Sequence, residues 1–278
     1  MTAHFQPGQM QRSRGEAAVR LVARPGSGEA VIAGLRQQGS AKAILPHAGA
    51  EPEVVFLNTS GGLTGGDRLA YRLDLGSGCR ATAMTQTAER AYRAGQGTAE
   101  VEVAMTVGAG GWLDWLPQET ILFDRSALSR RTVITLGPGA GCLAIEAVVL
   151  GRAAMRETLA GIAFRDRREI WRGPTPVMVE PLAISTEALS AGRAVLGGAR
   201  AFASLTMVST GAEAALPALR AALDEPGVEA AASGLDGRLM CRMRAGDGWP
   251  LRRQITRALA VLRQRPLPRV WQTLERMA

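Results

Sequence analysis

The chain has few of the residues from which most enzyme active sites are built. Its 278 residues include two histidines, His4 and His47, and one lysine, Lys42. No G-x-x-x-x-G-K-[ST] sequence is present, which excludes a P-loop nucleotide site. The G-x-S-x-G sequence of an α/β-hydrolase is also missing, and two histidines near the N-terminus leave little for a Ser-His or Cys-His pair. We therefore predict no catalytic residue and no residue that binds a nucleotide cofactor.

Cysteine is also scarce, and the three residues, Cys79, Cys142 and Cys241, lie far apart. Such a set does not form a disulfide framework, and neither C-x-x-C nor H-E-x-x-H occurs, so no closed zinc site is predicted. Residues 1–15 are polar, lack the apolar core of a secretory signal and are predicted to form a flexible tail. No run of 18 apolar residues indicates a membrane-spanning helix. These features favour a cytoplasmic protein without a membrane partner.

Acidic and aromatic side chains are in short supply as well. Thirty-three Lys and Arg residues against 25 Asp and Glu residues give a net charge of +8, and aromatic residues make up 4% of the chain. A basic chain has nucleic acid, an anionic membrane or an acidic protein as candidate partners. Arginine is spread along the whole chain, and few aromatic residues are available to stack on bases, which argues against a nucleic-acid partner.

Short alternating stretches separated by glycines dominate the middle of the chain. Apolar and polar residues alternate over Asp67–Leu75, Cys79–Thr87 and Thr98–Val107, which is typical of half-buried strands. Two further strands, Arg131–Leu136 and Cys142–Leu150, flank the sequence GPGAG, which predicts a β-hairpin. Strand patterns rather than helices follow both G-x-G-x-x-A sequences, so we interpret these as hairpin turns and not as dinucleotide-binding loops.

Two segments near the C-terminus depart from this alternation. Leucines at helical spacing predict a helix at about 212–224, where Thr210 and Glu213 form a candidate capping box. A second stripe of leucine and isoleucine predicts a helix at about 250–263, with Pro250 in its first turn. No repeat or linker divides the chain, so residues 16–278 are predicted to form one large, mainly β domain.

Three local sequences stand out from this pattern. The segment Asn58–Asp67 has four glycines in six residues and predicts a tight loop, in which Asp67 is either a turn-stabilising side chain or a ligand for a hard cation. Trp112 and Trp115 form either a binding surface or the end of a core strand. The sequence FRDRREIWRG at Phe164–Gly173 predicts a solvated hairpin.

Glu146 is the one acidic residue within the apolar strand Cys142–Leu150. Burying a carboxylate costs free energy unless it has a partner or water beside it. The strand therefore predicts either an arginine partner for Glu146 or a water-filled channel next to its side chain.

Five motifs follow one another along nearly the whole chain: NTSGGLTGGDRL (58–69), TQTAERAYR (85–93), WLPQETILFD (115–124), EAVVLGR (146–152) and PLPRVWQ (266–272). Their order and spacing resemble those of the urease accessory protein family UreD, also called UreH. The resemblance implies two packed β layers with many short strands and two helices near the C-terminus. It also implies a non-enzymatic scaffold that binds apo-urease and UreF, which recruits the nickel-carrying GTPase UreG for nickel insertion into urease.

The resemblance further implies an internal passage through which nickel moves transiently, with no tightly bound cofactor. Asp67, Glu146 and Glu180 are the acidic residues that we expect along it, because carboxylates bind nickel more weakly than imidazole or thiolate groups do. We expect the C-terminal helices and tail on the UreF side. The residues expected to contact partners are Trp112, Trp115, Arg269 and Trp271.

A different class of protein stays open as an alternative. It is a small stand-alone β-rich hydrolase that uses Asp67, Glu119 or Asp124 as acid and base, since paired carboxylates hydrolyse substrates without histidine. Such an enzyme acts alone, whereas a scaffold does nothing without urease. An assay for stand-alone activity therefore separates the two hypotheses.

Overall fold

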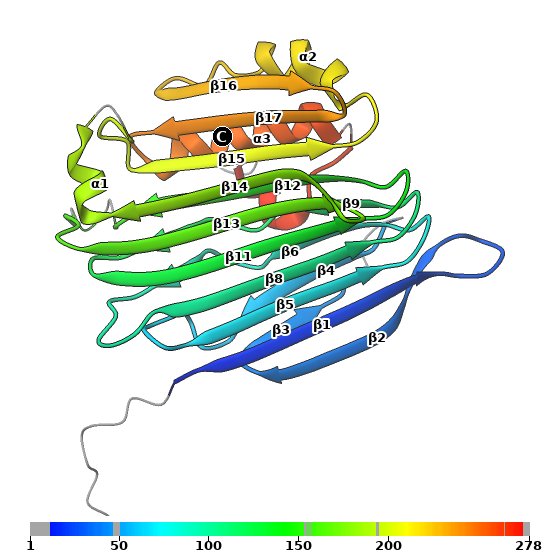
Figure 1. Cartoon of the computed structure of the whole chain (residues 1–278), viewed down its shortest axis with the longest axis horizontal. Coiled ribbons are helices and arrows are strands. Elements are labelled where there is room, and N and C mark those ends of the chain that lie inside the picture. The colour runs from blue at the N-terminus through cyan, green and yellow to red at the C-terminus, as the bar shows by residue number, and fades with distance from the viewer. Residues whose placement is uncertain are drawn as a thin grey trace, which may run out of the picture.

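A computed structural model describes residues 12–46, 51–152, 155, 157–192, 195–263 and 265–274. These residues form a mainly β structure in which two sheets lie face to face (Figure 1). The predicted mainly β fold with two packed layers is therefore confirmed. Of the predicted N-terminal tail, residues 1–11 lie outside the described residues, and the first strand begins at Arg14.

Seven strands of the described chain form the first sheet, in the spatial order β14 (Thr175–Ser185), β13 (Ile162–Arg172), β11 (Ser126–Leu136), β8 (Ala99–Val107), β5 (Arg68–Leu75), β1 (Arg14–Ala23) and β2 (Ala30–Gly39). The second sheet follows the order β16 (Val228–Leu235), β17 (Arg238–Ala245), β15 (Ala201–Val208), β12 (Gly141–Leu150), β9 (Trp112–Trp115), β6 (Arg80–Thr85), β4 (Glu53–Asn58) and β3 (Ala41–Ile44). Two short strands, β10 (Thr120–Leu122) and β7 (Glu89–Ala91), complete it to ten.

The chain winds between the sheets as a flattened coil. From β4 to β13 the longer strands alternate between the two sheets, and each pairs in parallel with a strand one turn of the coil away, as β5 does with β8 and β8 with β11. Strands β11 and β12 lie in different sheets, so the hairpin predicted around the GPGAG sequence is wrong. The hairpin turn predicted at residues 76–78 is wrong as well, because this glycine turn connects β5 in the first sheet to β6 in the second. Alternation in a sequence shows which side chains are buried but not which strand lies alongside.

Glycine turns at one end of this coil stack on one another. The N–H of Gly78 donates a hydrogen bond to the carbonyl oxygen of Ala109 in the neighbouring turn, at 2.8 Å. A Cβ atom at Gly108 would overlap the backbone nitrogen of Ser77. Glycine is needed there because the backbones of successive turns approach each other closely.

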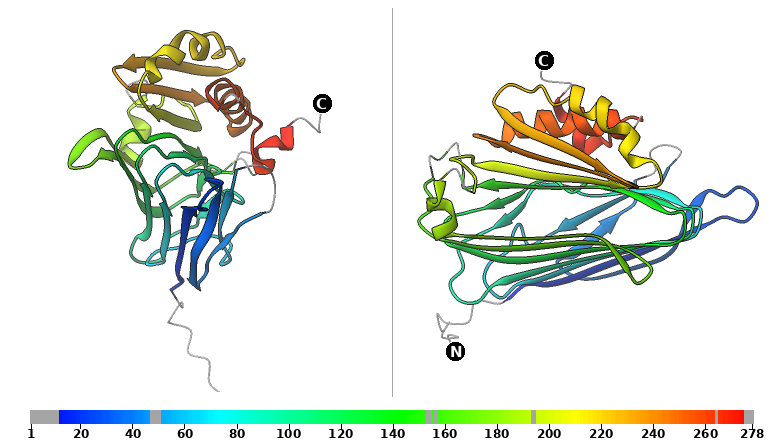
Figure 2. Two further views of the ribbon diagram at one scale, coloured as in Figure 1. Left: turned by 90° about the vertical axis from the view of Figure 1, so that its right-hand side faces the viewer. Right: turned by 45° about the horizontal axis from the view of Figure 1, so that its top comes forward.

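Helices cover the outer face of the second sheet. Helix α3 (Gly248–Arg263) confirms the helix predicted at 250–263 and packs against β15 and β17 (Figure 2). Short helical segments α1 (Thr186–Ser190) and η4 (Arg269–Leu274) were not predicted. No helix within the described ranges is long and apolar enough to cross a membrane.

The helix predicted at 212–224 is shorter in the structure. A 3-10 turn, η3 (Ala212–Ala215), leads into helix α2 (Leu216–Ala221). The predicted capping box is wrong, because the turn begins at Gly211 without a side-chain hydrogen bond. The Glu213 carboxylate instead accepts a hydrogen bond from the N–H of Gly237, at 2.9 Å.

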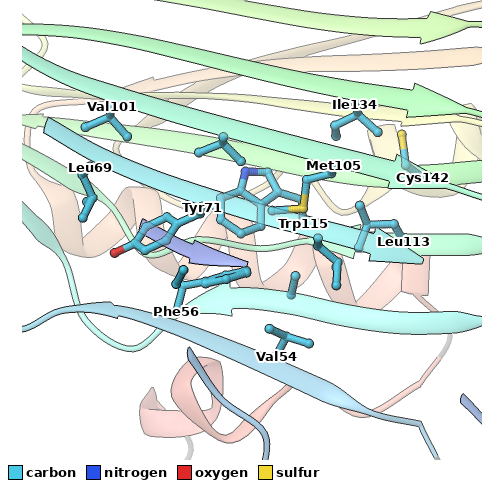
Figure 3. Close-up of a cluster of buried hydrophobic side chains, with 14 of the residues drawn as sticks. Val54, Phe56, Leu69, Tyr71, Val101, Met105, Leu113, Trp115, Ile134 and Cys142 are labelled. Atoms are coloured by element: carbon cyan, nitrogen blue, oxygen red, sulfur yellow. The ribbon is translucent and has the colours of Figure 1, made fainter. Parts of the chain in front are cut away.

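Two clusters of buried apolar side chains hold the layers together. One fills the space between the two sheets, where Phe56 contacts Tyr71 and Trp115 with ring centroids 4.8 and 6.3 Å apart (Figure 3). The other lies between the second sheet and α3. Strand β12 contributes side chains to both clusters, so both of its faces are buried.

Candidate functional site

Glu146 points from β12 into the space between the sheets. On the same face of β12, Cys142 and Val148 belong to the core between the sheets, while Leu143 and Ile145 on the opposite face pack toward α3. Successive side chains of a strand alternate between its faces, which places Glu146 in the interior. Only 5% of its surface is exposed.

Three side chains contact the Glu146 carboxylate. Arg130 on β11 forms an ion pair with it at 2.7 Å, and the Trp115 indole and the Thr132 hydroxyl donate hydrogen bonds at 3.1 and 3.3 Å. The arginine partner that the sequence predicted as one alternative is therefore present. Burial raises the pKa of Glu146, the charge of Arg130 opposes this rise, and the charge of Asp166 adds to it. Further positive charge near Glu146 would stabilise its ionised form.

Arg130 also binds a second buried carboxylate, that of Asp166 on β13. The two residues are paired positions on neighbouring parallel strands, and Nε and Nη2 of Arg130 donate to Oδ1 and Oδ2 of Asp166 at 3.0 and 2.8 Å. Burial acts to raise the pKa of Asp166, but the charge and hydrogen bonds of Arg130, with the charge of Arg168, hold it below its ordinary value. One guanidinium is thus shared by two carboxylates, and Glu146 is the less compensated of them.

Charged groups continue from Asp166 to the surface. Arg168 lies 3.5 Å from the Asp166 carboxylate and 3.2 Å from that of Glu180 on β14. Glu180 also accepts hydrogen bonds from the Ser204 hydroxyl at 3.0 Å and from Nε of Arg242 at 3.1 Å, and the Arg242 side chain is exposed. We call the following five residues the buried charge chain: Glu146, Arg130, Asp166, Arg168 and Glu180.

Cavities accompany the buried charge chain. A cleft of about 660 Å³ has Arg168, Glu180 and Ser204 in its wall. A cavity of about 20 Å³ shares Arg168 and Ser204 with this cleft and reaches Glu146. A further cavity of about 30 Å³ shares Glu146 and Trp115 with the second. Each small cavity has room for about one or two water molecules. The cavities therefore follow the buried charge chain from the surface cleft to the interior.

Asp67 lies apart from the buried charge chain. Its two carboxylate oxygens accept hydrogen bonds from the backbone N–H groups of Ser13 and Thr64, at 2.6 and 2.8 Å. It therefore closes the glycine loop as a turn-stabilising side chain, and it lines none of the three cavities described above. Of the three acidic residues predicted along a passage, the structure brings Glu146 and Glu180 into one network and leaves Asp67 outside it.

Two of the four residues predicted to contact partners are buried within the chain. Trp115 belongs to the core between the sheets. Trp271 is 1% exposed, donates a hydrogen bond from its indole to a backbone carbonyl at 3.0 Å, and lies 4.7 Å below the Arg252 guanidinium. These positions correct the expectation of a binding surface at Trp115 and Trp271. Trp112 is half-buried and Arg269 is exposed, and a role for them in partner binding stays a prediction.

Sequence reasoning missed three members of the buried charge chain, namely Arg130, Asp166 and Arg168. The signal was available on β13, where Asp166 and Arg168 alternate in step with the buried Phe164 and Ile170. A charged residue in step with apolar neighbours on a strand faces the core.

The segment Phe164–Gly173 does turn back as a hairpin, because β13 pairs antiparallel with β14. The predicted solvation of this hairpin is wrong for Asp166 and Glu169, which are both buried. Glu169 accepts hydrogen bonds from Arg131, Arg167 and Trp171 at 2.7–3.0 Å. These three side chains supply the hydrogen bonds that water was predicted to supply to Glu169.

Comparison with known proteins places the whole chain in one family. The family model described as UreD urease accessory protein matches residues 13–272. A protein of Cereibacter sphaeroides named urease accessory protein UreD is 66% identical over 266 residues, which cover 95% of this chain and 96% of the relative. Proteins of the same name from Paracoccus denitrificans and Sinorhizobium medicae are 52% and 45% identical, covering 96% and 91% of this chain and 94% of each relative. The chain therefore belongs to the UreD family of urease accessory proteins.

Proposed function

We propose that the chain acts in urease maturation as a non-catalytic cytoplasmic scaffold, which binds apo-urease and UreF and, through UreF, the nickel-loaded GTPase UreG. In this proposal nickel is cargo that passes through the interior of the chain along Glu180 and Glu146. The observation that carries the proposal is the buried charge chain with its cavities, which links the surface cleft to the space between the sheets.

The interior end of the buried charge chain favours a cation. The whole buried charge chain contains three carboxylates, those of Glu146, Asp166 and Glu180, against the two guanidiniums of Arg130 and Arg168. Arg242 pairs with Glu180 at the surface end and balances the total, but at the interior end Glu146 shares its cationic partner Arg130 with Asp166, so the buried charge of Glu146 is only partly compensated. Carboxylate oxygens bind nickel weakly compared with imidazole and thiolate groups, which suits release more than storage.

The alternative of a stand-alone carboxylate hydrolase has less support. Asp67 uses both of its oxygens on backbone N–H groups. Glu119 forms an ion pair with Arg252 at 3.3 Å, and Asp124 accepts hydrogen bonds from backbone N–H groups of residues 160 and 161. Each carboxylate thus has a local structural role, and none of the three lines the surface cleft.

Co-expression tests the proposal. The tagged chain is produced with the urease subunits, with and without UreF and UreG, the complexes are separated by size-exclusion chromatography, and nickel in the purified urease is measured by mass spectrometry. We expect co-elution with apo-urease, a larger species when UreF is present, and nickel in urease only when the chain is present. A folded chain that ignores both urease and UreF would overturn the scaffold.

Two variants test the passage in the same experiment. Glu146→Gln and Glu180→Gln keep the size of each side chain and remove its charge, so we expect both to lower the nickel content of urease while the complexes still form. Glu102→Gln is the matched control, because Glu102 is exposed on β8. Wild-type nickel content with both passage variants would exclude a route along these carboxylates.

A further inference from the structure

The spatial order of the described strands ends at β14 and β2 in the first sheet and at β16 and β3 in the second. A strand at the end of a sheet carries unpaired backbone N–H and C=O groups, to which another chain can add a strand. Folded proteins therefore usually cover or block such edges. Three of these four edges are protected in the structure, and the fourth, that of β2, differs from them.

Protection takes a different form at each of the three other edges. Strand β14 contains Pro176 and Pro181, which cannot donate a hydrogen bond to an added strand. Helix α2 packs beside β16, and the guanidinium of Arg220 donates two hydrogen bonds to a β16 carbonyl, at 2.9 and 3.1 Å. The amide of Gln37 covers β3, because it accepts a hydrogen bond from the N–H of Ala43 at 3.3 Å and donates one to the carbonyl of the same residue at 3.2 Å.

Strand β2 has none of these features in the described part of the chain. Its ten residues include no proline and a single charged side chain. The N–H of Ser40, just after β2, donates a hydrogen bond to the carbonyl of Arg14 on β1 at 3.1 Å. Because bonded positions alternate along an antiparallel pair, the N–H and C=O groups of Leu35 and Gln37 point away from β1. The outer edge of β2 therefore presents backbone groups that an added strand can bind.

Large apolar side chains accompany these backbone groups. Ile32 and Leu35 are 51% and 48% exposed, and they lie opposite Leu21 and Val19, which belong to the core between the sheets. The pairing of β2 with β1 shifts by one residue between the two positions. Side chains three residues apart on a regular strand point to opposite faces, and the shift brings both to the face that continues the core. A strand added beside β2 would cover them.

Basic side chains lie on the other face of the same edge. Arg36 of β2 is two residues along the strand from the position opposite Arg20 of β1, so the two arginines are diagonal neighbours. Both are exposed, and neither forms an ion pair with a residue that the structure describes. Farther into the sheet, Arg72 does form one, with Glu16 at 3.4 Å. An added strand would therefore meet uncompensated positive charge on this face.

We propose that the outer edge of β2 is a docking site for an extended segment of a partner protein, which joins the seven-stranded sheet as an eighth strand. Apolar side chains of this segment cover Ile32 and Leu35. The side chains between them are acidic and face Arg20 and Arg36. This charge favours an acidic partner over a second copy of the chain, whose own edge carries the same arginines.

The location of β2 suits a scaffold with more than one partner. It lies on the opposite side of the molecule from α2 and α3 (Figure 1). A segment docked on β2 therefore leaves the helical face accessible to another protein. The inference rests on the proposed function for the proteins that are tested, which are apo-urease and UreF.

Two pairs of variants of the full chain test the proposal. Leu35→Lys places a charge on the apolar face and is compared with Leu235→Lys, at a leucine of β16 that is 56% exposed. Arg36→Glu reverses the charge on the other face and is compared with Arg165→Glu, at an exposed arginine of β13. Binding to apo-urease and to UreF is measured separately, by titration and size-exclusion chromatography. Hydrogen exchange over residues 30–39 of the wild-type chain is measured with and without each protein.

We expect Leu35→Lys and Arg36→Glu each to weaken binding of one of the two proteins by about tenfold or more, as loss of a central interface side chain does, with both controls normal. Exchange over residues 30–39 should slow when that protein binds, because the amides of Leu35 and Gln37 become hydrogen-bonded. The exchange measurement needs no variant, so it keeps the test decisive if a variant folds poorly.

Three other results would overturn the proposal in distinguishable ways. Normal binding of both proteins by Leu35→Lys and Arg36→Glu, with unchanged exchange in wild type, would exclude the docking site and leave the proposed function standing. A chain that dimerises alone, and that Leu35→Lys makes monomeric, would assign the edge of β2 to a second copy. A folded wild-type chain that binds neither protein would overturn the proposed function, and this inference with it.

Discussion

Arg130 and Asp166 are paired positions on neighbouring parallel strands, and their side chains meet in a bidentate ion pair between the two sheets. The same guanidinium holds Glu146 at 2.7 Å on the facing sheet. One arginine therefore ties β11, β13 and β12 together across the interior. Its removal leaves two buried carboxylates without their shared partner.

Arg130→Met is expected to destabilise the fold strongly. Breaking a buried ion pair from one side costs about 3–5 kcal/mol, because the remaining charge stays buried without compensation. The measurement is the free energy of unfolding in urea. Arg165→Met is the control, since Arg165 is exposed on β13 and should change stability by less than about 0.5 kcal/mol. Equal stability of the two variants would contradict the role given to Arg130.

Gly108→Ala tests the stacking of the glycine turns. A Cβ atom at this position overlaps the backbone nitrogen of Ser77 in the neighbouring turn, so the turns must separate. We expect a loss of about 1–3 kcal/mol, as for other overpacked positions, measured by thermal or urea unfolding. Gly95→Ala should be close to neutral, because a Cβ atom added at Gly95 would meet no other atom within 4 Å. A neutral Gly108→Ala would argue against close stacking.

The sequence predicted the class of the fold but not the route of the chain. Alternation over Asp67–Leu75 and Thr98–Val107 identified β5 and β8, and the stripe at 250–263 identified α3. The pairing of the strands could not be predicted. The same glycine-rich sequence can connect two strands of one sheet or two strands of different sheets. The turn between β11 and β12 is of the second kind.

The candidate site was predictable where one charge stood alone in an apolar strand. Glu146 satisfied that condition, and the cost of burying it led to two open alternatives, an arginine partner or a water-filled channel, of which the arginine is present. Arg130 did not satisfy this condition, because it is followed by a second arginine, Arg131. Two adjacent arginines are typical of an exposed strand, although only Arg131 is exposed. The environment of the half-buried Glu89 could not be predicted either, because Asn58, which donates to its carboxylate, and Tyr71, which lines the same cavity, are distant in sequence.

Glu89 should give the metal-free chain a characteristic pH dependence. Burial raises the pKa of its carboxyl group to about 7 from an ordinary value of 4.5, so the folded state binds the proton more tightly than the unfolded state. The resulting stabilisation is complete below about pH 4.5 and is lost as the pH rises through 7. The measurement is the difference in unfolding free energy between wild type and Glu89→Gln from pH 4.5 to 7.5.

Wild type should lose at most about 3 kcal/mol relative to Glu89→Gln over this range. Groups that titrate in both proteins contribute equally to the two unfolding free energies, so their contribution is removed when the difference is taken. Glu102→Gln should show no such slope, since Glu102 is exposed on β8. If the difference in unfolding free energy between wild type and Glu89→Gln does not change with pH, Glu89 is ionised and solvated over the whole pH range.

Trp271→Ala tests whether the C-terminal segment is part of the fold. The Trp271 side chain is buried beneath Arg252 and hydrogen-bonded to the carbonyl of Leu116, and the preceding Arg265 forms ion pairs with Glu51 and Asp114. Truncating a buried tryptophan costs about 3–5 kcal/mol, so we expect a loss of that size in urea unfolding. Gln272→Ala, at an exposed neighbour, should be near neutral.

This prediction decides how a deletion after Arg263 is interpreted. We expect such a deletion to lose UreF, but it also removes Trp271 and Arg265 from the second sheet. Arg269→Ala separates the two effects, because Arg269 is exposed and its loss should leave stability unchanged within about 0.5 kcal/mol. Reduced UreF co-elution with a stable Arg269→Ala chain would place the contact at the C-terminal segment. Unchanged co-elution would assign the effect of the deletion to the loss of packing.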